Sequence, residues 1–279
     1  MRIRNRGCWL AGRIVWFFQL CAMTLSMCWR GYISYKGWSA LVHGIGLIIG
    51  YLGEYVVLYT MITNFPGVGG FTALEICFLY AMGLVAYALG NLHTREFWRM
   101  DELVLRGKLD LFLVRPVSPL LQLFVQDIQV GYLSHLVLGI GSMMLIKGMI
   151  GLSWDLAHWA LFFFSLLAGG ILMGGISLLT TPLTFWWGRS DAVTQFVRGG
   201  MRQTLQYPVT IYPKFIQRLL YIIPYAFVCY YPCLYLLEKD TSPLAVLYPF
   251  YTLLAGVITN LAFYLFWRLG LRRYNSAGG

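Results

Sequence analysis

The sequence contains few side chains of the types that carry out catalysis or bind metals, and these are not grouped. The four histidines are scattered, and the six cysteines lie mostly inside apolar runs, where we expect small buried side chains. Cys229 and Cys233 share a helical face at a spacing of four residues, but two thiols alone do not make a metal site. No nucleotide-binding Gly-x-x-x-x-Gly-Lys-Ser/Thr loop, His-Glu-x-x-His or Gly-x-Ser-x-Gly occurs. The sequence therefore predicts no catalytic or metal site and no cofactor bound by this chain.

The composition predicts that these residues lie in a membrane. Of the 279 residues, 59% are apolar and 11% are charged, and the mean hydropathy is +0.66. An average globular chain carries about 25% charged residues, and a soluble fold with so few charges could not cover its surface. We therefore expect an all-α integral membrane protein. The net charge of +10 then indicates membrane topology rather than nucleic-acid binding.

Polar residues inside the apolar runs are the candidates for a pathway through the membrane. Glu54 interrupts a long apolar run, and a charge near the bilayer centre costs about 2.5–3.5 kcal/mol on insertion scales, so it should face protein or a water-filled cavity. It can contact a cationic or polar part of the cargo, pair with Arg198 or Arg202, or simply lie close to the external interface. We expect Asn260 to bond across helices. Tyr51 completes this set of candidate pathway residues.

Uncharged runs of about 20 residues predict the membrane spans. We expect six transmembrane helices, over about 38–63, 71–93, 128–150, 156–181, 191–212 and 243–267. Residues 1–36 contain a shorter apolar stretch, which predicts an interfacial elbow helix. The chain is thus divided into an elbow at 1–36, a membrane domain at 37–270 and a tail at 271–279. Glycine pairs in the fourth span indicate close helix packing or room to bend.

The positions of the cationic residues predict the orientation. Lys and Arg are concentrated in the N-terminal region, in the polar segment 94–127 and in the tail. We therefore expect these parts, and both termini, to be cytoplasmic.

The stretch 188–240 fits this scheme in two ways. It offers two candidate helices, 191–212 and 217–238, and counting both as spans would put the basic tail outside. Several prolines interrupt the second candidate, and broken helices are tolerated at membrane depth only when buried in protein. We favour 191–212 as the fifth span and 213–240 as an external re-entrant hairpin, although 217–238 remains open as the fifth span.

The polar segment between the second and third spans carries the most specific pattern. The range 95–106 is predicted to form a short amphipathic helix, because apolar residues recur on one side: Phe97, Met100, Leu103 and Val104. Gly107 is a natural stop for that helix. A loop that only connects two spans is the alternative.

The residues from Gly107 to Pro119 read Gly-x-Leu-Asp-x-x-Leu-x-Arg-Pro-x-Ser-Pro. This motif, in its position between the second and third of six spans, resembles the ABC type-2 exporter permeases, and within them the branch that reads R-x-G-x-L-D-x-x-L-x-R-P-x-S. The resemblance covers almost the whole chain, including the elbow, the proline-rich stretch and the tail.

The resemblance implies the transmembrane half of an ATP-driven exporter, in which the helix at 95–106 is a coupling helix that docks on a separate ATPase subunit. The implied docking residues are Glu96, Phe97, Met100, Leu103, Arg106, Gly107, Leu109, Asp110, Arg115 and Pro116. Phe97, Trp98 and Leu103 are the expected anchors of an exposed apolar stripe.

The implied complex contains two ATPase subunits, which use ATP and Mg, and either a second copy of this chain or a paralogous permease. It would move an amphipathic or hydrophobic compound (a drug, lipid or metabolite) out of the cytoplasm by alternating access. The expected location is the bacterial inner membrane. The alternatives are a polysaccharide or ion exporter of the same architecture, and a membrane scaffold or sensor that transports nothing.

Overall fold

The computed structural model describes residues 44–60, 69–126, 129 and 131–276, with residues 23, 26, 42 and 64. Apart from residues 23 and 26, the predicted elbow helix lies outside these residues. Within the described ranges the chain is built from helices and contains no strand, which confirms the all-α class.

Among the described residues, four helices are long and apolar enough to cross a membrane, so the chain is an integral membrane protein. They are α2 (Ala73–Asn91), α6 (Tyr132–Ile150), α7 (Leu156–Leu179) and α13 (Tyr248–Arg273). They match the second, third, fourth and sixth predicted spans. The first predicted span, 38–63, contains a helix described over Gly44–Thr60, which is shorter than the other four.

The fifth predicted span, 191–212, does not form one long helix. Its helical part comprises α9 (Asp191–Gln195), a π-helical turn (Phe196–Gly200) and α10 (Met201–Thr204). About 14 residues give roughly 21 Å of helix, less than the roughly 30 Å of the hydrocarbon core. The helix ends ahead of Pro208, because the residue before a proline is driven out of the helical region.

The proline-rich stretch that follows forms a bent pair of helices. These are α11 (Lys214–Ile222) and the helical run Tyr225–Leu236, which includes α12 (Tyr230–Leu236), and they meet at 79°. Pro224 lies at the break, where its missing N–H prevents a continuous helix. This geometry is compatible with a re-entrant hairpin or with one broken span, so both readings of 213–240 stay open.

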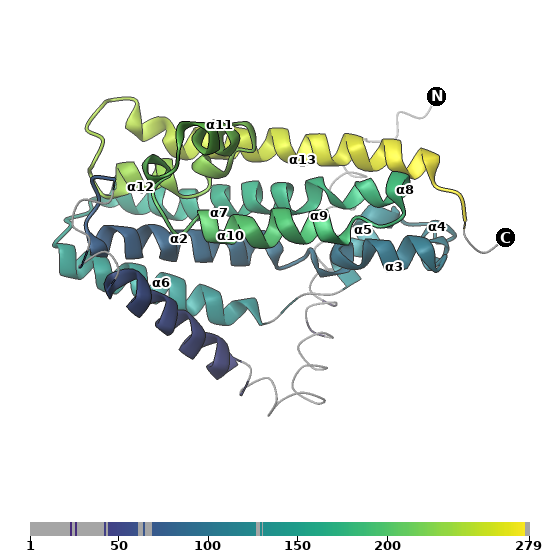
Figure 1. The fold of residues 1–279 in the computed structure, drawn as a ribbon, viewed down its shortest axis with the longest axis horizontal. Helices are drawn as coiled ribbons and strands as arrows, with labels where there is room; N and C mark the ends of the chain where they lie inside the picture. Colours follow the sequence, from purple (N-terminus) through teal and green to yellow (C-terminus); the bar gives the residue numbers. More distant parts are fainter. Residues whose placement is uncertain are drawn as a thin grey trace, which may run out of the picture.

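The long helices pack as a bundle in which α2 and α7 are central (Figure 1). Glycines let these two helices approach closely. A Cβ atom built on Gly90 would lie 2.5 Å from the backbone N of Gly174, and one built on Gly170 would lie 2.6 Å from the Cβ of Leu89. The glycine pairs of the fourth span therefore serve close packing.

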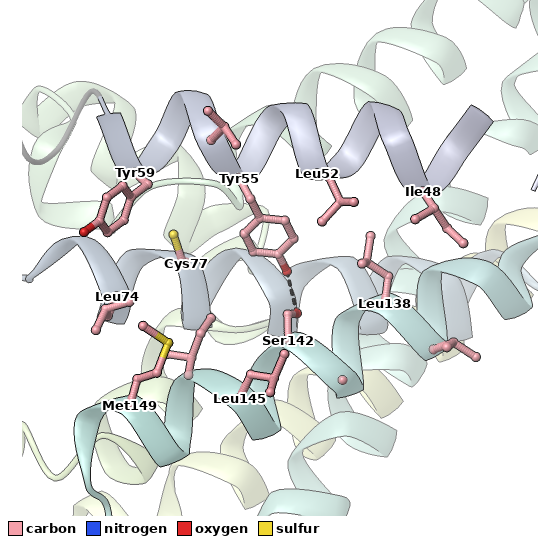
Figure 2. A pocket seen from close by; sticks show the side chains of 14 residues that line it. Ile48, Leu52, Tyr55, Tyr59, Leu74, Cys77, Leu138, Ser142, Leu145 and Met149 are labelled. Atoms are coloured by element: carbon pink, nitrogen blue, oxygen red, sulfur yellow. Dashed lines mark hydrogen bonds between the residues drawn. The ribbon is translucent and has the colours of Figure 1, made fainter. Parts of the chain in front are cut away.

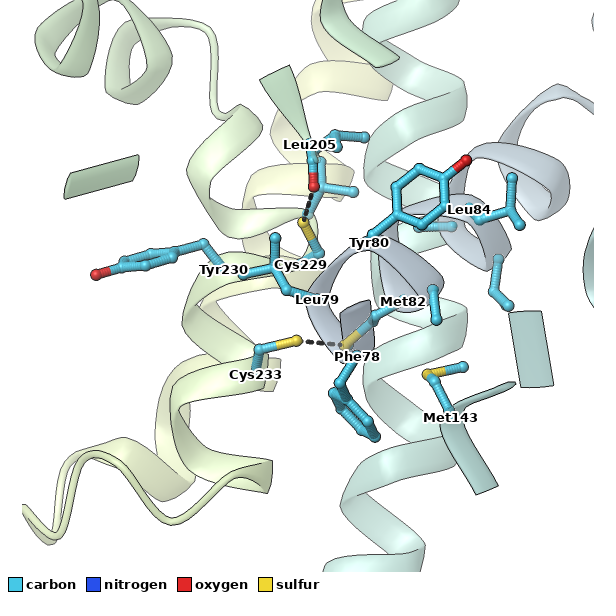
Figure 3. Packing of buried hydrophobic residues seen from close by; sticks show 14 of the residues in the cluster. Phe78, Leu79, Tyr80, Met82, Leu84, Met143, Leu205, Cys229, Tyr230 and Cys233 are labelled. Atoms are coloured by element: carbon cyan, nitrogen blue, oxygen red, sulfur yellow. Dashed lines mark hydrogen bonds between the residues drawn. The ribbon is translucent and has the colours of Figure 1, made fainter. Parts of the chain in front are cut away.

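The main core surrounds α2. Figure 3 shows Phe78 and Met82 of this helix facing α12 and α6. Three cysteines, Cys77, Cys229 and Cys233, are buried and unoxidised, and the Cys233 Sγ lies 3.3 Å from the Met82 Sδ. For these three, the expectation of small buried side chains is confirmed.

A second core lies at one end of the bundle, beneath the segment that joins α2 to α6. We call residues 94–126 the connecting segment. Figure 1 shows its helices at the same end as α8 (Thr184–Trp187) and the C-terminal end of α13. The Phe97 ring packs 4.8 Å from Phe124, and 5.9 Å from both Phe263 and Trp267 of α13, measured between ring centroids. The connecting segment is thus fixed to the bundle by an aromatic cluster.

Candidate functional site

The connecting segment consists of four short helical pieces. A 3-10 helix (Arg95–Arg99) leads into α3 (Met100–Leu105), followed by α4 (Asp110–Leu113) and α5 (Pro119–Gln126). Between α3 and α4, Gly107 has φ +65°, a left-handed conformation that favours glycine. The stretch 95–106 is helical as predicted, although as a 3-10 helix followed by α3 and not as one helix, and it ends ahead of Gly107. The helix of the third predicted span begins at Tyr132 and not at 128.

The apolar face of this helix packs inside the chain. Phe97 and Met100 are 1% and 2% exposed, and Glu96, Leu103 and Leu109 are buried as well. The predicted apolar face is confirmed. The expectation that Phe97 and Leu103 form an exposed stripe is wrong, because the nearest apolar surface is the chain's own bundle and these side chains bury themselves against it.

A different set of side chains is exposed on the connecting segment. Leu111 and Val114 are 62% and 80% exposed, and Leu105 is also exposed. The charged motif residues Arg106 and Arg115, and Pro116, lie on the surface with them. This set of Leu105, Arg106, Leu111, Val114, Arg115 and Pro116 is the outer face of the connecting segment.

An ion cluster on α3 borders the outer face. The Glu102 carboxylate accepts hydrogen bonds from Lys108 Nζ at 2.6 Å and Arg99 Nη2 at 3.0 Å, and lies 3.3 Å from Arg106 Nη1. The hydrogen bonds from Lys108 and Arg99 lower the pKa of Glu102 to about 2. The motif residue Asp110 accepts a hydrogen bond from Ser276 Oγ at 2.5 Å, which ties the tail to this segment.

Asp101 joins the connecting segment to α9. Its Oδ2 accepts hydrogen bonds from the backbone N–H groups of Ser190 and Asp191, both at 2.8 Å. Its Oδ1 accepts from the Thr184 hydroxyl at 2.5 Å. The first N–H groups of a helix usually bond to the side chain of a local N-cap residue. In α9 this acceptor is Asp101, which lies about 90 residues away in the sequence. Sequence reasoning missed Asp101, because only its spacing in α3 is visible in the sequence and its partners are distant.

Trp98 makes a second link to the same stretch. The Arg198 guanidinium lies over the Trp98 ring, 3.8 Å from its centroid, within range of a cation–π interaction. Trp98 was an expected anchor for a partner protein, but its ring faces Arg198 of the π-helical turn. The connecting segment thus contacts both the start of α9 and the turn that follows it.

Two of the five candidate pathway residues line one polar cavity of about 320 Å³. Tyr51 and Arg198 are brought together there. The other described lining residues are Leu47, Tyr87, Gln129, Gly131, Tyr132, His135 and Gly199. The Tyr51 hydroxyl and His135 Nε2 are hydrogen-bonded at 2.6 Å. His135 had no assigned role from the sequence, because it is a lone polar residue near the start of an apolar helix.

The remaining pathway candidates lie elsewhere. Glu54 accepts hydrogen bonds from the Tyr80 hydroxyl and from Gln206 Nε2. Asn260 Nδ2 donates to the carbonyl of Ile171 at 2.9 Å, which confirms the bond across helices and gives Asn260 a packing contact. The side chain of Arg202 lies outside the described part of the structure.

The described part of the chain is thus a helical bundle of the integral membrane class, in which α2 and α6 are joined by a folded, partly charged segment. A family model described as "ABC-2 family transporter protein" matches residues 48–278. The chain therefore belongs to the ABC-2 family transporter proteins, the membrane components of ABC transporters, which work with ATPase subunits. A search of curated proteins finds no match.

Proposed function

We propose that this chain is the permease subunit of an ATP-driven exporter in the bacterial inner membrane, with a separate ATPase docked on its connecting segment. The observation that carries the proposal is the double link from this segment to the α9 stretch, through Asp101 and Trp98. Displacement of the segment by a docked ATPase would be transmitted to the polar cavity at Arg198. No ATP or Mg is held by the permease, and both act in the partner.

The orientation follows from the distribution of charge. The end of the bundle with the connecting segment carries most of the described cationic residues, including Arg95 and Arg99 of the 3-10 helix and Arg272 and Arg273 in the last turn of α13. The opposite end keeps Lys147, Lys214, Arg218 and Lys239. The positive-inside rule favours the connecting segment and the C-terminus on the cytoplasmic side, where ATP is available.

The outer face is the surface we assign to ATPase docking. It combines exposed aliphatic side chains with Arg106 and Arg115, a composition suited to a protein interface with a small apolar centre and a charged rim. Glu96, Phe97, Met100, Leu103 and Leu109 then support this surface from below, and Asp110 fixes the tail beside it. The complex would hold two permeases, as two copies or a pair of paralogues, and two ATPases.

Copurification tests this assignment. Leu111→Asp and Val114→Asp each place a charge at the centre of the outer face without disturbing the buried aromatic cluster. We expect the detergent-solubilised native chain to recover an ATPase subunit, identified by mass spectrometry, and either variant to recover less than about a tenth as much.

The matched control is Leu244→Asp, because Leu244 is 61% exposed and lies near the start of α13, at the opposite end. This variant should retain the ATPase. If the native chain brings down no ATPase under conditions that preserve other membrane complexes, the transporter proposal fails and a membrane scaffold becomes the better function.

A further inference from the structure

We infer that the polar cavity binds the anionic headgroup of an amphiphile. The apolar chain of this amphiphile lies in a neighbouring groove, and both spaces are lined by the helix Gly44–Thr60, α2 and α6. That this amphiphile is a transported cargo rests on the proposed function, whereas its binding in the cavity does not.

The charge of the polar cavity is the first argument. Among the described lining residues, Arg198 is the one with a formal charge when histidine is counted as neutral, and there is no carboxylate among them. Arg198 makes no ion pair with the other described residues, and its guanidinium lies over the Trp98 ring. An arginine held in a protein cavity near the membrane is stabilised by an anion that accepts its N–H donors.

The uncharged lining residues suit a headgroup as well. Tyr51, His135 and Tyr132 form a rigid aromatic wall, with the Tyr51 and Tyr132 rings 4.7 and 5.0 Å from the His135 ring between centroids. The buried side-chain oxygen of Gln129 has no hydrogen-bond partner among the described residues. If the amide turns its NH₂ group toward the cavity, it can donate to a carboxylate or phosphate oxygen, and if it presents its oxygen, it can accept from the O–H of a singly protonated phosphate.

The apolar groove is the second argument. Figure 2 shows it between the helix Gly44–Thr60, α2 and α6, and it has a volume of about 600 Å³. Ile48, Leu52, Val137, Leu145 and Met149 contribute to an almost wholly apolar lining. Its main polar atoms are paired, since the Tyr55 and Ser142 hydroxyls are hydrogen-bonded at 2.7 Å.

The groove and the polar cavity are adjacent along both helices. Tyr51 lines the cavity and Leu52, the next residue, lines the groove, while on α6 His135 and Leu138 are about one helical turn apart. The cavity lies near the ends of α2 and α6 that meet the connecting segment, on the side assigned to the cytoplasm. A molecule with an acidic head and an apolar chain is complementary to this pair of spaces.

Equilibrium binding of radiolabelled dodecyl phosphate to the full chain in phosphatidylcholine nanodiscs tests the inference. We expect saturable binding to one site per chain. Arg198→Gln should weaken it at least about tenfold, because hydrogen bonds to a charged group are lost. Arg218→Gln removes the same charge from an exposed position on α11 and should bind as the native chain does.

A second variant tests the groove. A Cβ atom on Gly141, which lines the groove, meets nothing within 4 Å, so Gly141→Phe should fill the groove without disturbing the fold. We expect it to weaken dodecyl phosphate binding at least about fivefold, since part of the chain can no longer be buried. Thermal unfolding of both variants checks that they are folded.

Three results would overturn the inference. The first is unchanged binding of dodecyl phosphate to Arg198→Gln. The second is competition by dodecyltrimethylammonium as strong as that by unlabelled dodecyl phosphate. The third is equally strong competition by inorganic phosphate, which would show a site for a simple anion. The binding assay needs no ATPase, and copurification of the ATPase needs no ligand, so failure here is distinguishable from failure of the proposed function.

Discussion

Glycines determine how closely the central helices of this membrane protein approach. Gly90 of α2 faces Gly174 of α7, and a Cβ atom on Gly174 would lie 2.9 Å from the Gly90 carbonyl oxygen. Helices in a membrane gain stability from close packing, because lipid offers no hydrophobic drive for them to associate. A stripe of small residues therefore stabilises a contact that larger side chains would open.

Gly90→Ala is expected to lower the thermal stability of the chain in detergent by about 1–3 kcal/mol, because its new methyl group meets backbone atoms that cannot move aside. Gly141→Ala is the matched control, since that position in α6 has open space. It should be neutral or slightly stabilising. Equal melting temperatures for the two variants would contradict the role given to the Gly90 contact.

At the scale of elements, the main interaction is the capping of α9 by a residue of another helix. α9 begins after Gly188, which has φ +70°, and its Ser190 N–H and Asp191 N–H groups are held by Asp101 of α3. Because the carboxylate lies at the positive end of the helix, the contact is both a hydrogen bond and a favourable charge–dipole interaction. Movement of α3 therefore changes the environment of the stretch that carries Arg198.

Asp101→Asn should weaken this link by about 1–3 kcal/mol, because the charge and one strong acceptor are lost. We expect faster hydrogen–deuterium exchange of the amides of 190–195, measured by mass spectrometry, and reduced stimulation of the partner ATPase by cargo.

Glu102→Gln is the control for Asp101, since it removes a carboxylate from the same helix. The Glu102 carboxylate belongs to the ion cluster at the surface, and such pairs contribute little to stability. In Glu102→Gln, the hydrogen–deuterium exchange of the amides of 190–195 should be unchanged. If Asp101→Asn leaves exchange at 190–195 as it was, the capping contact does not hold α9.

At the scale of the whole molecule, the bundle has two chemically different ends. One end carries the connecting segment and the last turn of α13, with Arg272 and Arg273. At the other end, Lys239 pairs with Glu75 at 2.8 Å and donates to the Gly70 carbonyl, which joins the loop before α13 to the start of α2. The two ends would face the two sides of the membrane.

Cysteine labelling tests which side each end faces. Val114→Cys places a thiol on the outer face, and Leu244→Cys places one at the opposite end. With a membrane-impermeant maleimide, we expect Val114→Cys to react only in inside-out vesicles and Leu244→Cys only in right-side-out vesicles, above the labelling of the native chain. The reverse pattern would invert the proposed orientation.

Much of the fold could be predicted from local properties of the sequence. The four long helices follow from apolar runs whose lengths match the bilayer, since every backbone polar group must be satisfied inside such a segment. The short helix at 95–105 and its stop at Gly107 follow from periodicity and from the freedom of glycine at positive φ. The broken helix after Pro213 follows from the prolines.

Only the tertiary structure decided what each apolar helix face packs against. The stripe of Phe97, Met100 and Leu103 is apolar whether it is covered by a partner or by the chain itself, and only the position of α13 shows that it is covered by Phe263 and Trp267. In the same way, the meeting of Tyr51 with Arg198, and of Asp101 with α9, depends on segments about 90 to 150 residues apart. The sequence by itself determined which stretches are helical and which faces are apolar, because these are local properties. Packing of the helices decided which polar groups share a cavity, because that is a property of the whole fold.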